Sequence, residues 1–230
     1  MPWRPQRWTL RPDLEKREIA ALVKEQRWTE VLERTRAFSQ VWPEAGWPYV
    51  HQFLARISMD GVPEATTWAR ATLQEDHTRG IQGFLGAAIV MFTLTPCPVG
   101  GWSDLAPESP EAELVALAEQ AWQVGRSKSV WAACALPVVR ALQGRCREAR
   151  DLAVEARTLH TLGAMEMGWM AAAESLADAG EGNADGARHW LQQLRMASPD
   201  SRYLPVAEAS LEIADAGGLN PRIDPEDDAW

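Results

Sequence analysis

The chain has 230 residues, 46% of them hydrophobic and 24% charged, which is typical of folded proteins and excludes global disorder. Its formal net charge of -9 argues against a general nucleic-acid-binding protein, because contacts with polyphosphate need clustered lysine and arginine. The charge is uneven: residues 1–40 hold nine Lys/Arg and six Asp/Glu, whereas residues 203–230 hold one Arg and seven acids. Association of the basic segment with the acidic one is therefore one possible mode of self-assembly.

Cysteine usage and hydropathy indicate a cytoplasmic protein. The three cysteines, Cys97, Cys134 and Cys146, have no CxxC spacing and leave one thiol unpaired in any disulfide scheme, so we expect a reducing compartment. The longest apolar run, residues 83–94, is roughly half of the ~20 residues that span a bilayer. Residues 1–8 contain no apolar core, so we expect neither a membrane segment nor a secretion signal.

The first twelve residues are predicted to form an irregular arm in which arginines alternate with Trp3 and Trp8. Interleaved arginine and tryptophan can engage nucleic acid, an anionic membrane or an acidic protein. In so acidic a chain we favour a protein partner over nucleic acid or membrane. The alternative is an arm that caps the first hairpin.

Helical periodicity starts near Asp13, which is predicted to be an N-cap, and continues to residue 216. Apolar residues recur there at spacings of three and four, as Trp47, Val50 and Leu54 illustrate, and no alternating strand pattern is present. A segment rich in proline and glycine, residues 95–110, interrupts this domain, and residues 217–230 form an acidic tail. The predicted helices span residues 13–25, 29–41, 47–58, 63–74, 78–94, 111–124, 127–143, 147–162, 164–179, 184–197 and 203–216.

A repeat organises these helices. Three times a tryptophan precedes an alanine by eighteen residues, and in two of the three cases a second tryptophan follows three residues later. This spacing is typical of a repeated antiparallel helix pair. We therefore expect an all-α array of about five helix hairpins with a C-terminal capping helix. The repeated residues are Trp47 with Ala65 and Trp68, Trp131 with Ala149, and Trp169 with Ala187 and Trp190.

The second helices of these hairpins resemble those of the tetratricopeptide (TPR) repeat, a helix-turn-helix unit with a small residue in its second helix and a proline at its end. The resemblance covers residues 13–216 and implies a superhelix whose first helices line a concave groove. Phe53 and Pro137 depart from it, because the family has a small residue there. Variable repeat lengths are also similar to the helical repeats of large bacterial transcriptional regulators. The matching residues are Trp28, Val31, Phe38 and Pro43, then Gly144, Glu148 and Ala149, then Ala187, Leu191, Leu194 and Pro199.

If the groove exists, its candidate contacts are the repeated tryptophans and their neighbours. A ladder of rings could grip a peptide there, since each can bury ~150–250 Å². The alternative is that the rings pack between hairpins and fill the core. The inserted loop could display a tryptophan as an anchor or pack back across the groove. The predicted partner-binding residues are Trp47, Val50, Trp102, Trp131, Cys134, Trp169 and Ala172, with Tyr49 close by.

Gly80, Gly83 and Gly86 recur every three residues. The spacing is GxxGxxG rather than the GxGxxG of dinucleotide sites, and no strand precedes it. We therefore predict a small-residue helix face that allows another helix to approach closely.

The chain as a whole is predicted to be a protein-interaction module or scaffold that binds a partner protein or peptide. We expect no enzyme, cofactor or metal, because the four histidines are scattered and form neither HxxxH nor HExxH. One alternative is a regulatory helical domain that senses a small molecule under the long loop. Another is a structural protein that associates with itself.

Overall fold

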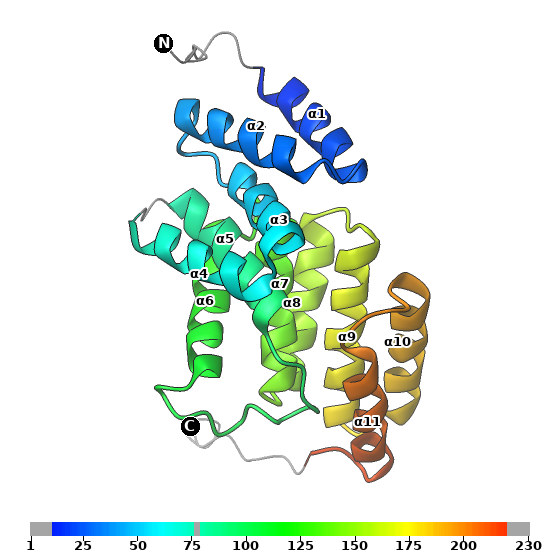
Figure 1. Ribbon diagram of the computed structural model, residues 1–230. Coiled ribbons are helices and arrows are strands. Elements are labelled where there is room, and N and C mark those ends of the chain that lie inside the picture. The colour runs from blue at the N-terminus through cyan, green and yellow to red at the C-terminus, as the bar shows by residue number, and fades with distance from the viewer. Residues whose placement is uncertain (1–10, 76–78, 220–230) are drawn as a thin grey trace, which may run out of the picture. The chain divides into compact units, whose positions relative to one another are not determined.

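The computed structural model describes residues 11–75 and 79–219 (Figure 1). Within these ranges the chain forms eleven α-helices and no β-strand, so the all-α prediction is confirmed. Most of the predicted arm and acidic tail lies outside the described residues. The helices are α1 (Pro12–Lys24), α2 (Trp28–Val41), α3 (Trp47–Asp60), α4 (Val62–Glu75), α5 (Arg79–Thr93), α6 (Pro110–Gly125), α7 (Val130–Leu142), α8 (Cys146–Leu159), α9 (Ala164–Gly180), α10 (Ala184–Ala197) and α11 (Leu204–Asp215).

One local detail differs from the predictions, and the proline that was predicted to lie inside a helix is found there. Helix α1 begins one residue before Asp13, with Arg11 as its N-cap residue, so Asp13 lies in the first turn, where its charge favours the helix dipole. Pro137 is accommodated inside α7, which continues from Val130 to Leu142. Proline has no N–H to donate to the carbonyl four residues earlier, so the helix lacks one hydrogen bond at this point.

The described chain falls into two compact units that interleave along the sequence. Unit 1 comprises Met1–Thr95 and Pro107–Leu136, and unit 2 comprises Pro96–Ala106 and Pro137–Trp230. Helix α7 therefore begins in unit 1 and ends in unit 2, and the division falls at the proline inside it. Most of the segment predicted as an insertion into one repeat domain belongs to unit 2.

The core of unit 1 is built from neighbouring hairpins. Apolar residues of α1 and α2, including Ile19 and Val31, pack with Ala55 of α3. A chain of aromatic rings extends this core: Phe53 of α3 lies 5.8 Å from Phe92 of α5 between ring centroids, and Phe92 lies 5.7 Å from Trp131 at the start of α7. Helix periodicity thus places the apolar faces of successive helices against one another.

Helices α5 and α6 approach closely through glycine. A Cβ atom at Gly83 would lie 2.9 Å from the Cα of Gly125, closer than side chains tolerate, and the atoms that it would meet include backbone that cannot swing aside. At Gly86, one turn along α5, the nearest atom would be 3.7 Å away, an ordinary contact. The predicted small-residue face is therefore confirmed at Gly83, whereas the side-chain position of Gly80 lies outside the description.

These two glycines give a matched pair of substitutions. We expect Gly83→Ala to destabilise unit 1 by about 1–3 kcal/mol through overpacking against Gly125. Gly86→Ala should leave stability unchanged or raise it by up to about 1 kcal/mol, because alanine favours a helix and the contact is tolerated. Urea unfolding followed by circular dichroism measures both. Equal effects of the two substitutions would show that the close approach carries no constraint.

Unit 2 is organised around α9, which packs against α8, α10 and α11 (Figure 1). Every residue of α9 from Gly168 to Gly180 is buried, including Glu174, Ser175 and Asp178. The Ser175 hydroxyl donates a hydrogen bond of 3.0 Å to the carbonyl oxygen of Ala187 in α10. Burial on all sides explains the small residues that make up most of this helix.

The end of the described chain closes unit 2. Leu219 donates its N–H to the Gly180 carbonyl oxygen at 2.8 Å. Its side chain lies against Gly100, Gly144 and Gly180, where an added Cβ would be 3.0, 3.1 and 3.6 Å from it. Gly144 also has φ +77°, a backbone conformation that glycine adopts without strain, in the turn between α7 and α8. Glycine at these positions makes room for one leucine.

Candidate partner-binding site

The structure buries most of the seven residues predicted to bind a partner. Only Trp47 keeps intermediate exposure. This burial favours the alternative that the repeated tryptophans pack in the core, and their contact with a partner stays a prediction. Nor do the seven share one unit, since Trp102, Trp169 and Ala172 belong to unit 2 and the others to unit 1. The buried residues are Val50, Trp102, Trp131, Cys134, Trp169 and Ala172.

Trp47 packs where α2 and α3 meet. Its ring lies 4.9 Å from that of Phe38 and 5.6 Å from the imidazole of His51, and the Lys16 ammonium lies 5.6 Å above it. His51 also bonds to the Trp47 carbonyl oxygen at 3.1 Å, and burial lowers the pKa of His51. Neighbours on three sides give Trp47 a structural role.

The loop tryptophan is also held in place. The N–H of Trp102 donates to the carbonyl oxygen of Leu142 at 3.0 Å, and the ring is only 5% exposed. Three residues earlier, the N–H of Val99 donates to the Ser210 hydroxyl of α11 at 3.3 Å. These contacts favour a loop that packs onto unit 2 over one that displays an anchor.

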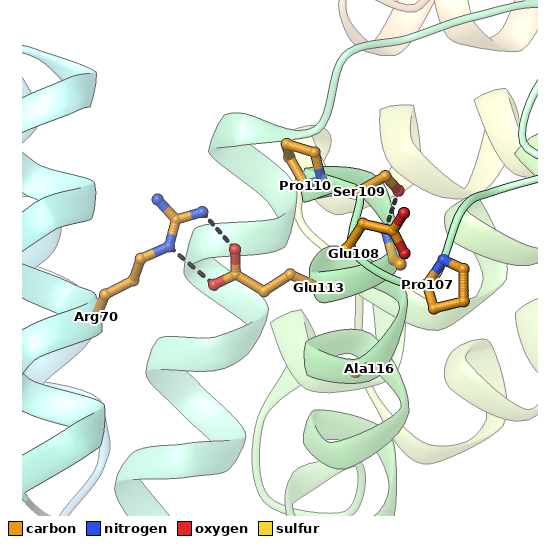
Figure 2. A pocket seen from close by; sticks show the side chains of 8 residues that line it. Arg70, Pro107, Glu108, Ser109, Pro110, Glu113 and Ala116 are labelled. Atoms are coloured by element: carbon orange, nitrogen blue, oxygen red, sulfur yellow. Dashed lines mark hydrogen bonds and ion pairs between the residues drawn. The ribbon is translucent and has the colours of Figure 1, made fainter.

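A shallow depression of about 500 Å³ lies in unit 1, between α4 and the start of α6 (Figure 2). Two of its polar contacts are internal: the Arg70 guanidinium makes two hydrogen bonds of 2.9 Å with the Glu113 carboxylate, and the Ser109 hydroxyl accepts the Ala112 N–H and caps α6. Arg70, Glu113 and the Ser109 hydroxyl of the depression thus already have partners within the protein.

Unit 2 contains a partly buried ionic network between α8 and α9. Arg150 contacts Asp178 and, at 2.7 Å, Glu181, and Arg157 contacts Glu174. The side chains of Glu174 and Asp178 are only 3% and 6% exposed, so their charges need these partners. Burial by itself would lower the pKa of Arg150. The nearby carboxylates have the larger effect, so the pKa of Arg150 is raised. The arrangement joins α8 to α9.

Removing one carboxylate from this network should destabilise the protein. We expect Glu174→Ala to lower the free energy of unfolding by about 2–3 kcal/mol. That is less than the ~3–5 kcal/mol of a fully buried pair, because both arginines remain partly exposed. The control is Asp185→Ala, because its fully exposed carboxylate pairs with Arg188 at 3.6 Å and its removal should cost much less stability. Thermal unfolding compares the two, and similar small losses would contradict a structural role for the network.

The cysteines of the structure are thiols of unequal accessibility. Cys134 and Cys146 are buried and Cys97 is partly exposed. Burial, together with the nearby Glu181 carboxylate, raises the pKa of Cys146 to about 11, so the thiol is protonated at neutral pH. In the described residues no group of three or more histidine, cysteine or acidic side chains is arranged to hold a metal ion.

Alkylation should report this difference. At pH 8 a thiol with a pKa of about 11 is ionised to roughly one part in a thousand, so Cys146 should react with iodoacetamide far more slowly than Cys97. Peptide mass spectrometry after timed labelling measures both rates, and 8 M urea should make them similar. Equal rates in the folded protein would contradict the burial of Cys146.

Exposed apolar side chains gather at one end of unit 2. Leu159 ends α8, Met165 and Met167 lie in the first turn of α9, and Met196 lies near the end of α10; their exposed fractions run from 38% to 63%. The close contact of Gly168 with Ser198 shows that the start of α9 packs on the end of α10. We call Leu159, Met165, Met167 and Met196 the methionine end.

The sequence analysis did not identify the methionine end. One signal was available: residues two apart on a helix point in different directions, so Met165 and Met167 cannot both enter one core face. Met196 gave no such signal, because its place beside the start of α9 depends on how α9 and α10 pack. The surface is therefore a product of tertiary structure.

Among the described helices, none combines the length and the apolar character that crossing a membrane requires. No protein-family model, curated protein or solved structure matches the chain.

Proposed function

We propose that the chain is a protein-interaction module that binds a partner protein through the methionine end of unit 2. The observation that carries this proposal is the concentration of exposed apolar side chains at the junction of three helices. Exposed apolar side chains that cluster on one part of a surface often mark an interaction site. The geometry therefore favours a docking surface for an apolar partner.

The chemistry of these side chains suits a protein partner. Methionine is unbranched and polarisable, so it adapts its shape to a partner surface and can follow the apolar face of a helix. Two features elsewhere support binding over catalysis: the buried carboxylates of α9, Glu174 and Asp178, are paired with arginines, and the Cys146 thiol is protonated. A cytoplasmic location, as expected from the cysteine pattern, belongs to the same proposal.

A finer assignment of the all-α fold belongs to the same proposal. We propose that the helices form TPR-like hairpins, with α1 and α2 as the first pair and α9 and α10 as the last. Packing between α1 and α2, α3 and α4, α5 and α6, and α9 and α10 supports that pairing. The position of α11 against α9 and α10 suits a capping helix.

Charge placed on the methionine end should abolish partner binding without unfolding the protein. We expect Met165→Glu/Met167→Glu to lose the stoichiometric partner that the wild-type protein captures from its own cell lysate. A buried carboxylate without a partner group opposes an apolar contact strongly. The two side chains are exposed in the free protein, so its melting temperature should change by less than about 2 °C.

The matched control is Met59→Glu in unit 1, because Met59 is exposed to a similar extent, 48%. It should capture the same partner as the wild type. Loss of the partner in both variants, or in neither, would refute the methionine end as the binding surface. Capture of the protein itself alone would instead identify a second copy as the occupant.

A further inference from the structure

The last three described residues leave α11 through two glycines. The Gly217 N–H donates to the Ala214 carbonyl oxygen at 3.1 Å, and the Gly218 N–H donates to that of Ile213 at 2.9 Å, which is the hydrogen-bond pattern of a Schellman motif. Both glycines have positive φ, +95° and +90°, so the chain turns away from the helix before Leu219. We call residues 217–219 the strap.

The strap ends in a socket that fits one methyl group. Cβ atoms added at Gly100, Gly144 and Gly180 would all meet the same atom of Leu219, its Cδ1, at 3.0, 3.1 and 3.6 Å. These glycines lie in the loop of residues 96–106, in the turn after α7 and at the end of α9. Three segments that are distant in the sequence therefore leave room together for a single branched side chain.

The Cys146 thiol lies beside this socket. The Cβ position of Gly180 that meets Leu219 also contacts the Cys146 sulfur and lies 3.0 Å from a methyl group of Val99. The thiol donates a hydrogen bond of 3.4 Å to the Gly144 carbonyl oxygen. Cys146 is 7% exposed, whereas Leu219 is only half-buried. The leucine therefore lies on the solvent side of the thiol and helps to shield it.

The walls of the socket are held without the strap. Gly144 and Arg145 donate their N–H groups to carbonyl oxygens of α7 and so close the turn after that helix, and the turn after α9 is closed in the same way. The strap adds a bond of 2.8 Å from the Leu219 N–H to the Gly180 carbonyl oxygen. Segments that are held by few contacts open locally while the rest stays folded. Leu219 can therefore leave the socket without breaking the bonds that form these turns.

We propose that the strap opens and closes over the socket, and that opening exposes Val99 and the Cys146 thiol to solvent while the helices of unit 2 stay folded. The occupant of the closed socket is Leu219 of the same chain. Gly217 is exposed and a Cβ added there would meet nothing within 4 Å, so this glycine is free to pivot. The socket lies at the end of α9 and the methionine end at its start, so the strap is a conformational control separate from the proposed binding surface.

The wild-type protein provides the first test, through timed iodoacetamide labelling at increasing urea concentrations below the unfolding transition. Local opening exposes little surface, so the labelling rate of Cys146 should rise less than about twofold between 0 and 1 M urea. Amide hydrogen exchange in the buried part of α9 requires unfolding of unit 2 and should rise about fivefold or more. Equal urea dependence would show that the thiol is exposed only when the unit unfolds, and would overturn the proposal.

The decisive variant is Leu219→Ala in the full-length protein. It should raise the labelling rate of Cys146 at least about tenfold, because the socket loses its occupant. The matched control is Leu162→Ala, since Leu162 is another half-buried leucine of unit 2 and lies just before α9; it should change the rate less than about threefold. Leu219→Met keeps an apolar side chain of similar volume and should retain most of the protection. Similar labelling of the two alanine variants would contradict the strap.

Two further readouts separate the strap from a purely structural leucine and from a second copy. In Leu219→Ala the buried amides of α9 should stay protected from exchange by at least about a hundredfold, because the helices remain folded. Loss of that protection together with the protection of Cys146 would show that the leucine holds the whole unit together, and would overturn the proposal. Labelling of the wild type should not depend on protein concentration. Protection of Cys146 that disappears on dilution would identify a second copy as the source of the strap and would also overturn it.

Discussion

The burial of α9 on every side is the constraint on which unit 2 depends. A helix enclosed by three others must be thin, and the residues from Gly168 to Gly180 are mostly alanine and glycine. It must also satisfy any polar group that it carries. Arg150 and Arg157 of α8 meet its two carboxylates, and a carbonyl of α10 accepts the Ser175 hydroxyl hydrogen. The sequences of the surrounding helices are thus partly dictated by the one they enclose.

In unit 1, close packing of helices depends on glycine. Gly83 and Gly125 let α5 and α6 touch backbone to backbone, while larger rings such as Phe53 and Phe92 fill the remaining space. Core packing in the two units therefore buries most of the tryptophans that the sequence predicted to contact a partner. What remains exposed is smaller and chemically different, namely Leu159 and the three methionines of the methionine end of unit 2. Core packing does not explain the exposure of these side chains, and that is why we propose that they bind a partner.

The sequence predicted most of the secondary structure correctly. The eleven predicted helices are all present, most with ends within two or three residues, because apolar periodicity and turn glycines such as Gly61 and Gly144 act locally. The division into units was not readable. It depends on bonds between distant residues, such as the one from Trp102 to Leu142.

The candidate sites escaped the sequence for a related reason. Arg34 and Arg36 look alike in the sequence, yet Arg34 contacts two glutamates of α1 and Arg36 has no ion pair within the described chain. Only tertiary packing separates an arginine that holds helices together from one that makes no ion pair within the described chain. The same holds for tryptophan, since ring size alone does not tell a core residue from a contact residue.

The interleaving of the two units has a consequence for how the chain is made. A ribosome delivers residues 96–106 before it delivers α8–α11, the helices that complete unit 2, whereas unit 1 is complete once residue 136 has emerged. The apolar side chains of Val99 and Trp102 are therefore synthesised before the helices that cover them. In the meantime the sequence on both sides of them can fold into unit 1. No single cut of the chain separates the two units, so neither unit can be made whole as one continuous fragment of this sequence.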